Sequence, residues 1–295
     1  MTEHEKRAAE IFRQQGLPFQ TAKRAKGGWT NAVWLNGDAV LRLSQHRDRD
    51  RLRREMELAK LLPAPIGYPA TIAMGIEAGY EWCLSERVQG QNLSRVWKKL
   101  RTPEKEKALR QIFAMARSVH AVDVRQAERF SSRQAWYSSF DRDTSMADME
   151  RYAAKNIFTP AQRRSLRDML ERFYDSLARA PAVLNHGDIT MDNLLWRDGD
   201  VVSLLDFEGS VIAPPQLDLH SLANLDVNLT AGLCKPFLAG KDEEDLLLGY
   251  AILFRMRFLE FWIEERRGRL SKNDAYQKLA ALSEGNGGYL AELLT

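Results

Sequence analysis

The sequence predicts an α+β protein with a strand-rich first lobe, residues 1–88, and a mainly helical second lobe, residues 89–295. Short apolar runs joined by the turn pairs Asn36-Gly37 and Asp198-Gly199 are typical of β-hairpins. After residue 90, longer stretches repeat apolar residues every three or four positions, which is the period of an amphipathic helix. Together the two patterns indicate the division into lobes.

The elements of the first lobe follow from local signals. A helix is predicted over residues 3–15, because its apolar residues have helical spacing and Gly16 follows. A strand (19–26), a glycine turn (27–31) and a hairpin (32–43) are predicted next. A second helix (47–62) and two further strands (71–74 and 80–88) complete the lobe.

In the second lobe, helices are predicted over residues 92–100, 103–122, 159–178 and from 242 through 263, with Thr159 as an N-cap and further helices closing the chain. Residues 126–158 show no clear period. We expect either an acceptor-selecting segment or a polar connector with one short helix there.

Composition excludes several classes of protein. Hydrophobic residues make up 44% of the 295 residues and charged residues 28%, as in ordinary globular proteins. The formal charge of +3 is small for this length and gives no support for nucleic-acid binding. Two cysteines, far apart, do not suggest a disulfide framework or a zinc site. The N-terminus is too charged for a secretion signal, and the longest apolar run, residues 246–254, is too short to cross a bilayer. We therefore expect a cytoplasmic protein without a membrane partner.

The segment from Val183 to Gly209 contains the most informative polar residues. Three short apolar runs in it predict buried strands. Asp188 and Asn193 lie in the loop after the first run, and Asp206 lies just past the third. These three side chains can therefore converge, and hard oxygen ligands together with phosphate oxygens suit Mg²⁺.

This segment resembles the aminoglycoside phosphotransferase and choline kinase family of small-molecule kinases. Their motif reads H-G-D-x-x-x-x-N followed by an apolar residue and D-x-E, a relative of the H-x-D-x-x-x-x-N and D-F-G motifs of protein kinases. Here the motif corresponds to residues 186–193 and 205–208. The resemblance implies a bilobal protein-kinase-like fold.

The resemblance also implies roles for single residues. Asp188 would be the catalytic base, and Asn193 and Asp206 would hold Mg²⁺. His186 and Glu208 would support the site, although a structural histidine and a surface acid are the alternatives for these two.

The segment VLRLS places Arg42 where the family carries the cation that contacts the α- and β-phosphates. The segment RREMELAKLL resembles the helix whose glutamate pairs with that cation, which points to Glu55, with Glu57 as the rival. The alternatives are a solvent-facing strand arginine and an exposed pair of Glu55 with Arg51 within the helix.

Other nucleotide contacts are implied near the ends of the strands. Gly28 and Thr30 lie in a glycine turn that can approach phosphates, although an ordinary β-turn is the alternative. The segment WCLSERVQGQNL resembles the family's hinge between lobes, which makes Glu86 and Val88 candidates for the adenine side. Asp218, in the segment PPQLDL, would brace the catalytic loop.

The implied reaction is Mg²⁺-dependent transfer of the γ-phosphoryl group of ATP or GTP to a hydroxyl of a small molecule. An aminoglycoside or other antibiotic is slightly favoured, because acids at 141–150 and 242–245 can attract a cationic acceptor; the latter group also suits a helix N-terminus. A metabolite kinase acting on choline, homoserine or a sugar and a nucleotide-binding pseudokinase are the alternatives. The five histidines lack the spacing of a metal-dependent hydrolase. The sequence does not define the oligomeric state.

Overall fold

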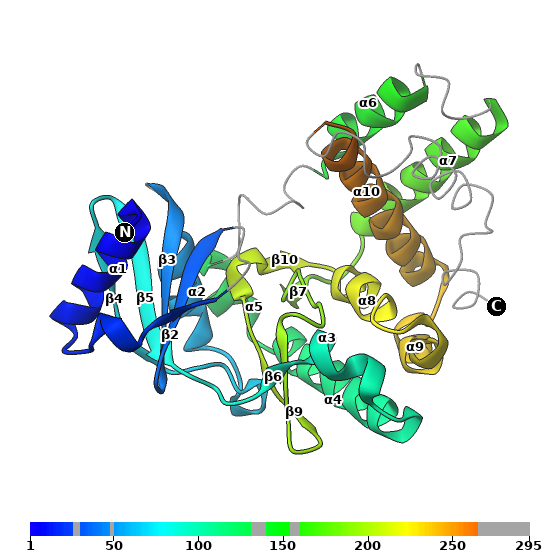
Figure 1. Cartoon of the computed structure of the whole chain (residues 1–295). Coiled ribbons are helices and arrows are strands. Elements are labelled where there is room, and N and C mark those ends of the chain that lie inside the picture. Colours follow the sequence, from blue (N-terminus) through cyan, green and yellow to red (C-terminus); the bar gives the residue numbers. More distant parts are fainter. Residues whose placement is uncertain (26–29, 48–49, 131–139, 154–159, 265–295) are drawn as a thin grey trace. The chain divides into compact units, whose positions relative to one another are not determined.

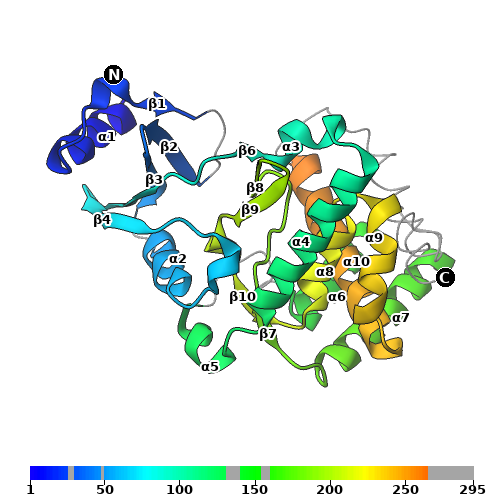
Figure 2. The ribbon, with the colours of Figure 1, turned by 90° about the horizontal axis from the view of Figure 1, so that it is seen from below.

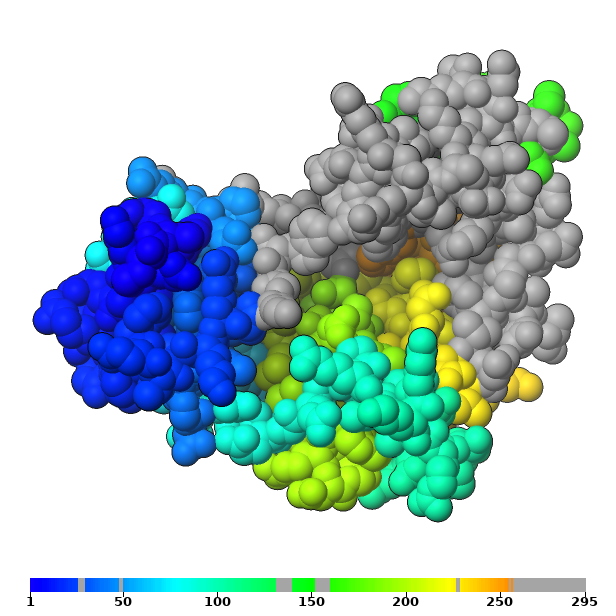
Figure 3. Space-filling view, in the orientation of Figure 1, coloured from blue at the N-terminus to red at the C-terminus, as the bar shows by residue number. Residues whose placement is uncertain are grey.

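The computed structural model describes residues 1–25, 30–47, 50–130, 140–153 and 160–264 (Figure 1 and Figure 3). The chain forms two compact units. The first contains residues 1–104 and 191–208, and the second contains residues 105–190 and the chain from residue 209. The predicted lobe boundary near residue 88 stays a prediction.

A five-stranded antiparallel sheet forms the centre of the first unit, in the order β1-β2-β3-β5-β4. The strands are β1 (Lys23–Arg24), β2 (Asn31–Asn36), β3 (Ala39–Arg47), β4 (Thr71–Glu77) and β5 (Tyr80–Glu86). The predicted hairpin between β2 and β3 is confirmed: Asn36 pairs with Ala39, and Gly37 has a φ of 58°. That left-handed conformation is one that glycine adopts at little cost.

Two helices cover the faces of this sheet (Figure 2). Helix α1 (Glu3–Gln14) packs Ile11 and Phe12 against strand residues that include Trp34 and Leu43. Side chains alternate between the two faces of a strand, so Arg42 lies on the other face. Helix α2 (Arg51–Ala59) covers that other face, where Leu52 and Met56 cluster with Cys83, the residue that pairs with Arg42.

A three-stranded sheet completes the first unit, in the order β6-β8-β9. Its strands are β6 (Gln91–Asn92), β8 (Leu194–Arg197) and β9 (Asp200–Leu204), and the short helix α3 (Leu93–Val96) follows β6. The predicted turn between β8 and β9 is confirmed, with φ values of 52° at Asp198 and 88° at Gly199. Gly67 lies against β9, because a Cβ at that position would be 2.0 Å from the Val202 carbonyl oxygen.

The second unit is mainly helical and contains one two-stranded sheet, β7 (Val183–Asn185) with β10 (Val211–Ala213). Its helices are most of α4 (Thr102–His120), then α5 (Val124–Ala127), α6 (Arg142–Ala153), α7 (Pro160–Leu177), α8 (Gln216–Ala223), α9 (Val227–Cys234) and α10 (Lys241–Glu264). Helices α7 and α10 pack closely, since a Cβ on Gly249 would lie 2.1 Å from the Phe173 ring. Within the described ranges, no helix is long and apolar enough to span a membrane.

Short 3₁₀ turns connect several elements, at Phe19–Thr21, Ala64–Ile66, Trp97–Lys99, Glu128–Phe130, Phe207–Gly209 and Lys235–Phe237. The first of these corrects the prediction of a strand over residues 19–26, because pairing with β2 begins at Lys23. The cause is local: the Thr21 hydroxyl and the Asn36 side-chain amide both donate to the Pro18 carbonyl, each at 2.9 Å, and hold a turn there. Three predicted features lie outside the described residues: most of the glycine turn, the N-cap at Thr159 and the closing helices.

Candidate active site

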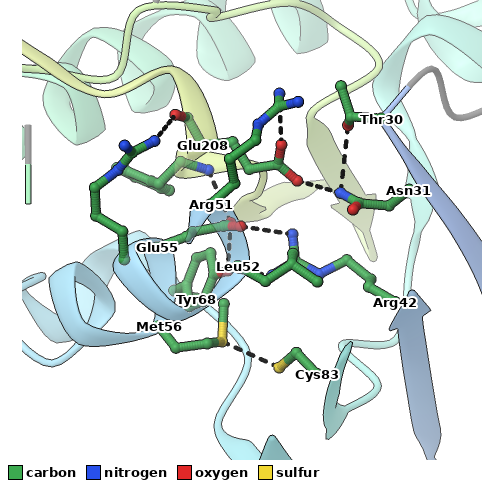
Figure 4. A network of polar contacts seen from close by, with 12 residues as sticks. Thr30, Asn31, Arg42, Arg51, Leu52, Glu55, Met56, Tyr68, Cys83 and Glu208 are labelled. Atoms are coloured by element: carbon green, nitrogen blue, oxygen red, sulfur yellow. Dashed lines mark hydrogen bonds and ion pairs between the residues drawn. The ribbon is translucent and has the colours of Figure 1, made fainter. Parts of the chain in front are cut away.

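Glu55 is the centre of a buried polar network in the first unit (Figure 4). Its Oε2 accepts a hydrogen bond from Arg42 Nη1 at 2.8 Å. Its Oε1 accepts from the Tyr68 hydroxyl at 2.5 Å and from the Phe207 backbone N–H at 2.9 Å. The carboxylate is fully buried, so these donors supply the hydrogen bonds that water would otherwise give. Glu55 thereby joins helix α2, strand β3 and the segment that follows Asp206.

The network decides between the two acids and fixes the charge of Arg42. Glu55 contacts Arg42, whereas Glu57 forms an exposed pair with Lys60. Burial opposes the charge on Arg42, but interaction with Glu55, and then with Tyr68 and Asp206, outweighs burial and holds the pKa of Arg42 well above its ordinary value. Arg42 therefore stays cationic.

Glu208 is a second buried acid in this unit. Its side chain accepts a hydrogen bond from the Asn31 amide and pairs with Arg51 at 2.9 Å, and its carbonyl accepts from Arg54 at 3.2 Å. Burial, and then the charge of Glu55, raise the pKa of Glu208, although Arg51 acts in the opposite direction. The surface-acid alternative for Glu208 is therefore wrong, and Arg51 pairs with Glu208 at the helix start.

Asp206 and Asn193 lie on neighbouring chain segments. The Asn193 carbonyl accepts a hydrogen bond from the Leu205 N–H at 2.8 Å, next to Asp206. Asp206 has a φ of 67°, an uncommon conformation for a residue other than glycine. Such strain is found at functional sites, where surrounding contacts maintain it.

Carboxylate oxygens of Glu55, Asp206 and Glu208 all lie within 4.8 Å of one another. Hard oxygen donors at this spacing suit Mg²⁺. Two of the three acids already pair with arginines, Glu55 with Arg42 and Glu208 with Arg51. The motif predicts Asp206 as the Mg²⁺ ligand of this group, and that role stays a prediction.

In the second unit, Asp218 holds the segment that contains Asp188. The fully buried Asp218 carboxylate accepts from the backbone N–H groups of His186 at 2.9 Å and Gly187 at 2.8 Å, and it lies 3.1 Å from His120 Nε2. Burial alone would raise the pKa of Asp218, but the hydrogen bond and charge of His120 outweigh it and lower the pKa.

The Asp188 side chain is exposed, while its backbone N–H donates to His186 Nδ1 at 3.1 Å. His186 is buried and orients the backbone beside Asp188. An exposed carboxylate on a hydrogen-bonded loop is compatible with general base catalysis, which requires the base to reach the hydroxyl proton of the acceptor. The catalytic role of Asp188 stays a prediction.

The candidate nucleotide contacts receive less support. Gly28 lies outside the described residues. The Thr30 carbonyl accepts from Gln45, and its hydroxyl accepts from Asn31 at 3.3 Å. Glu86 is exposed at the end of β5, and its N–H donates to Ala70. Val88, two residues further along, is partly buried. Their contacts with a nucleotide stay predictions.

Most acids that were expected to attract a cationic acceptor have internal partners. Asp242 pairs with Arg179, Glu244 with Lys241, Asp245 with Arg172 and Lys241, Glu150 with Arg163 and Arg167, and Asp148 with Arg151. Asp242 also lies in the first turn of helix α10. The charge of these residues is therefore partly balanced within the second unit.

Sequence reasoning missed three residues of the network: Tyr68, Asn31 and Arg51. Tyr68 has no motif of its own, since its partners lie 13 and 26 positions away. Asn31 was treated as part of the glycine turn, and its bond to Glu208 spans 177 positions. For Arg51, the available signal was a basic residue preceding the apolar face of α2.

The fold and the polar network define a class of protein. A five-stranded sheet with a strand cation paired to a helix acid, and an Asp-Phe-Glu segment bonded to that acid, is the arrangement of a protein-kinase-like phosphotransferase. The chain belongs to the phosphotransferase enzyme family, abbreviated APH, whose model matches residues 21–262. It is a small-molecule kinase, as the motif predicted.

Solved structures confirm the predicted fold. The GDP complex of aminoglycoside 2'-phosphotransferase-IIIa is similar with a TM-score of 0.73 and 17% identity, over 97% of this chain and 99% of that chain. A ternary complex of aminoglycoside phosphotransferase APH(4)-Ia with AMP-PNP and hygromycin B has a TM-score of 0.64 and 16% identity, over 98% and 100%. Macrolide 2'-phosphotransferase MphH from Brachybacterium faecium has a TM-score of 0.60 and 18% identity, over 95% and 98%. A comparison with curated protein sequences finds no match.

Proposed function

We propose that this kinase transfers the γ-phosphoryl group of ATP or GTP to a hydroxyl of a small molecule with the help of Mg²⁺. The observation that carries the proposal is the buried Glu55 carboxylate, which binds both Arg42 and the backbone N–H of Phe207. One acid thus fixes the strand cation and the segment that carries Asp206. Relatives of the same fold hold GDP, ADP or ATP, which supports a purine nucleotide as donor.

In this proposal each residue contributes one part of the reaction. Asp188 orients the acceptor hydroxyl and takes its proton. Arg42 contacts the phosphates and balances their charge. Asp206 and Asn193 would hold Mg²⁺, which would neutralise charge at the transferred group when it is bound. Little else is required, because phosphoryl transfer depends mainly on positioning and electrostatics.

For the acceptor we propose an aminoglycoside or another antibiotic. Similar structures are complexes with kanamycin, streptomycin and hygromycin B, and one is a macrolide phosphotransferase. The internal ion pairs of the acids in α6 and α10 weaken the argument for a polycation in particular. An uncharged or weakly charged antibiotic, or a metabolite such as choline, homoserine or a sugar, therefore belongs in the same test.

The test is release of ADP or GDP by the purified protein with Mg²⁺, ATP or GTP, and a panel of these acceptors. We expect one acceptor class to stimulate release. In Asp188→Asn, turnover falls by about a thousandfold or more, while nucleotide affinity stays within a few-fold of wild type. Nucleotide binding with no stimulated release by any acceptor would favour the pseudokinase alternative, and normal turnover of Asp188→Asn would remove Asp188 from the base role.

A further inference from the structure

Tyr68 lies in the segment that joins α2 to β4, and its hydroxyl contacts both members of the central ion pair. It donates to Glu55 Oε1 at 2.5 Å and accepts from Arg42 Nη2 at 3.0 Å. We propose that Tyr68 is a positioning residue that fixes the guanidinium plane of Arg42 toward the nucleotide phosphates. The inference rests on the proposed function, and it adds a residue that no motif contains.

The directions of these bonds are fixed by chemistry. A phenol has one hydrogen, and the Glu55 carboxylate can only accept, so that hydrogen points to Glu55. The oxygen lone pairs then remain for the Arg42 N–H, because a guanidinium can only donate. Arg42 therefore uses Nη1 for Glu55 and Nη2 for Tyr68. Two bonds on different nitrogens of a planar group hold it against rotation.

The need for a second hydrogen bond to fix the cation is specific to arginine. A lysine ammonium is a compact charge that one carboxylate can place, whereas a guanidinium is wide and must be oriented to present its fork to phosphate. The Glu55 contact alone leaves the plane of Arg42 free to turn about that bond. We infer that Arg42 and Tyr68 form a matched pair.

The ring of Tyr68 has contacts of its own. Its edge packs against Phe207, with ring centroids 5.6 Å apart and planes at 82°. The preceding residue, Gly67, has a φ of 62° and lies against Val202 of β9. The Tyr68 ring and the backbone that precedes it therefore each have a packing contact. The side chain contacts Arg42 and also the residue next to Asp206, so it links the cation to the proposed metal ligand.

The experiment is a double-mutant cycle of Tyr68→Phe and Arg42→Lys, with binding of AMP-PNP and Mg²⁺ measured by titration calorimetry. This readout needs no acceptor, and its stoichiometry counts only folded protein. Tyr68→Phe should weaken binding about tenfold in the Arg42 protein, which is the loss expected if the turned guanidinium gives up one charged hydrogen bond to phosphate. In the Arg42→Lys background the same change should weaken binding less than about threefold.

Tyr174→Phe is the matched control, because that buried hydroxyl bonds to the Phe140 carbonyl at 3.0 Å in the second unit. It should leave nucleotide affinity unchanged. Wild-type nucleotide affinity in Tyr68→Phe would overturn the inference. An equal loss of affinity from Tyr68→Phe in the Arg42 protein and in the Arg42→Lys protein would also overturn it, because a general structural role of Tyr68 gives that result. Failure of the wild-type protein to bind nucleotide would instead overturn the proposed function itself.

Discussion

Replacing Glu55 by glutamine should destabilise the first unit while leaving side-chain volume unchanged. The amide oxygen of the new side chain can replace Oε1 and accept from Tyr68 and Phe207. Its NH₂ group would then face Arg42 Nη1, donor against donor, where Oε2 now accepts at 2.8 Å. Breaking a buried ion pair by removing one charge costs about 3–5 kcal/mol. Arg42 keeps 16% exposure, so we expect the lower end, about 3 kcal/mol in the free energy of unfolding.

Hydrogen exchange measured by mass spectrometry can isolate this effect, because it reports the opening free energy of each peptide separately. Peptides from β3 and α2 should lose protection, whereas peptides from α7 serve as the internal reference. Glu57→Gln is the control: its exposed pair with Lys60 contributes less than about 0.5 kcal/mol. Equal effects of the two substitutions, or unchanged protection in β3, would refute the view that Glu55 is the centre of the network.

Three further predictions concern other features. Asp206→Asn should lower Mg²⁺-dependent nucleotide affinity but keep a free energy of unfolding close to that of the wild type, because asparagine tolerates a positive φ. In urea unfolding, Asp206→Ala should be about 1 kcal/mol less stable than Asp206→Asn. The pKa of Glu208 is raised, so the folded state binds its proton more tightly than the unfolded state does. The free energy of unfolding should therefore fall as pH rises above the ordinary pKa of 4.5. Urea unfolding of Glu208→Gln should lack this dependence on pH. Gly249→Ala should lower the melting temperature through contact with Phe173, whereas Gly232→Ala, with nothing within 4 Å, should raise it slightly.

The sequence predicted those parts of the fold that depend on local chemistry. The turns at Gly37 and Gly199 were predictable because few residues other than glycine adopt a positive φ. Glu55 falls on the apolar face of α2 with Leu52 and Met56, and an acid on such a face signals a buried partner. The strand expected over residues 19–26 failed because side chains of Thr21 and Asn36 compete for the backbone there.

Tertiary contacts explain what could not be predicted. Tyr68 lies outside every motif, and only the folded chain brings its hydroxyl to Arg42. The same holds for Asn31, whose partner Glu208 is far along the sequence. The pairing of acids with arginines in α6, α7 and α10 also depends on helix packing. Helical periodicity alone could not distinguish these acids from a binding surface for a cationic acceptor.

The first unit is assembled from two separate pieces of chain, residues 1–104 and 191–208. This arrangement has a consequence for synthesis on the ribosome. At about 5–20 residues per second, roughly 5–20 s pass between residue 104 and residue 208. Until then Glu55 lacks the Phe207 N–H and Gly67 lacks strand β9. We therefore predict that nascent chains stalled near residue 150 are cleaved by protease within the N-terminal sheet, and that chains stalled beyond residue 250 resist; equal resistance at both lengths would show that the first piece folds without the second.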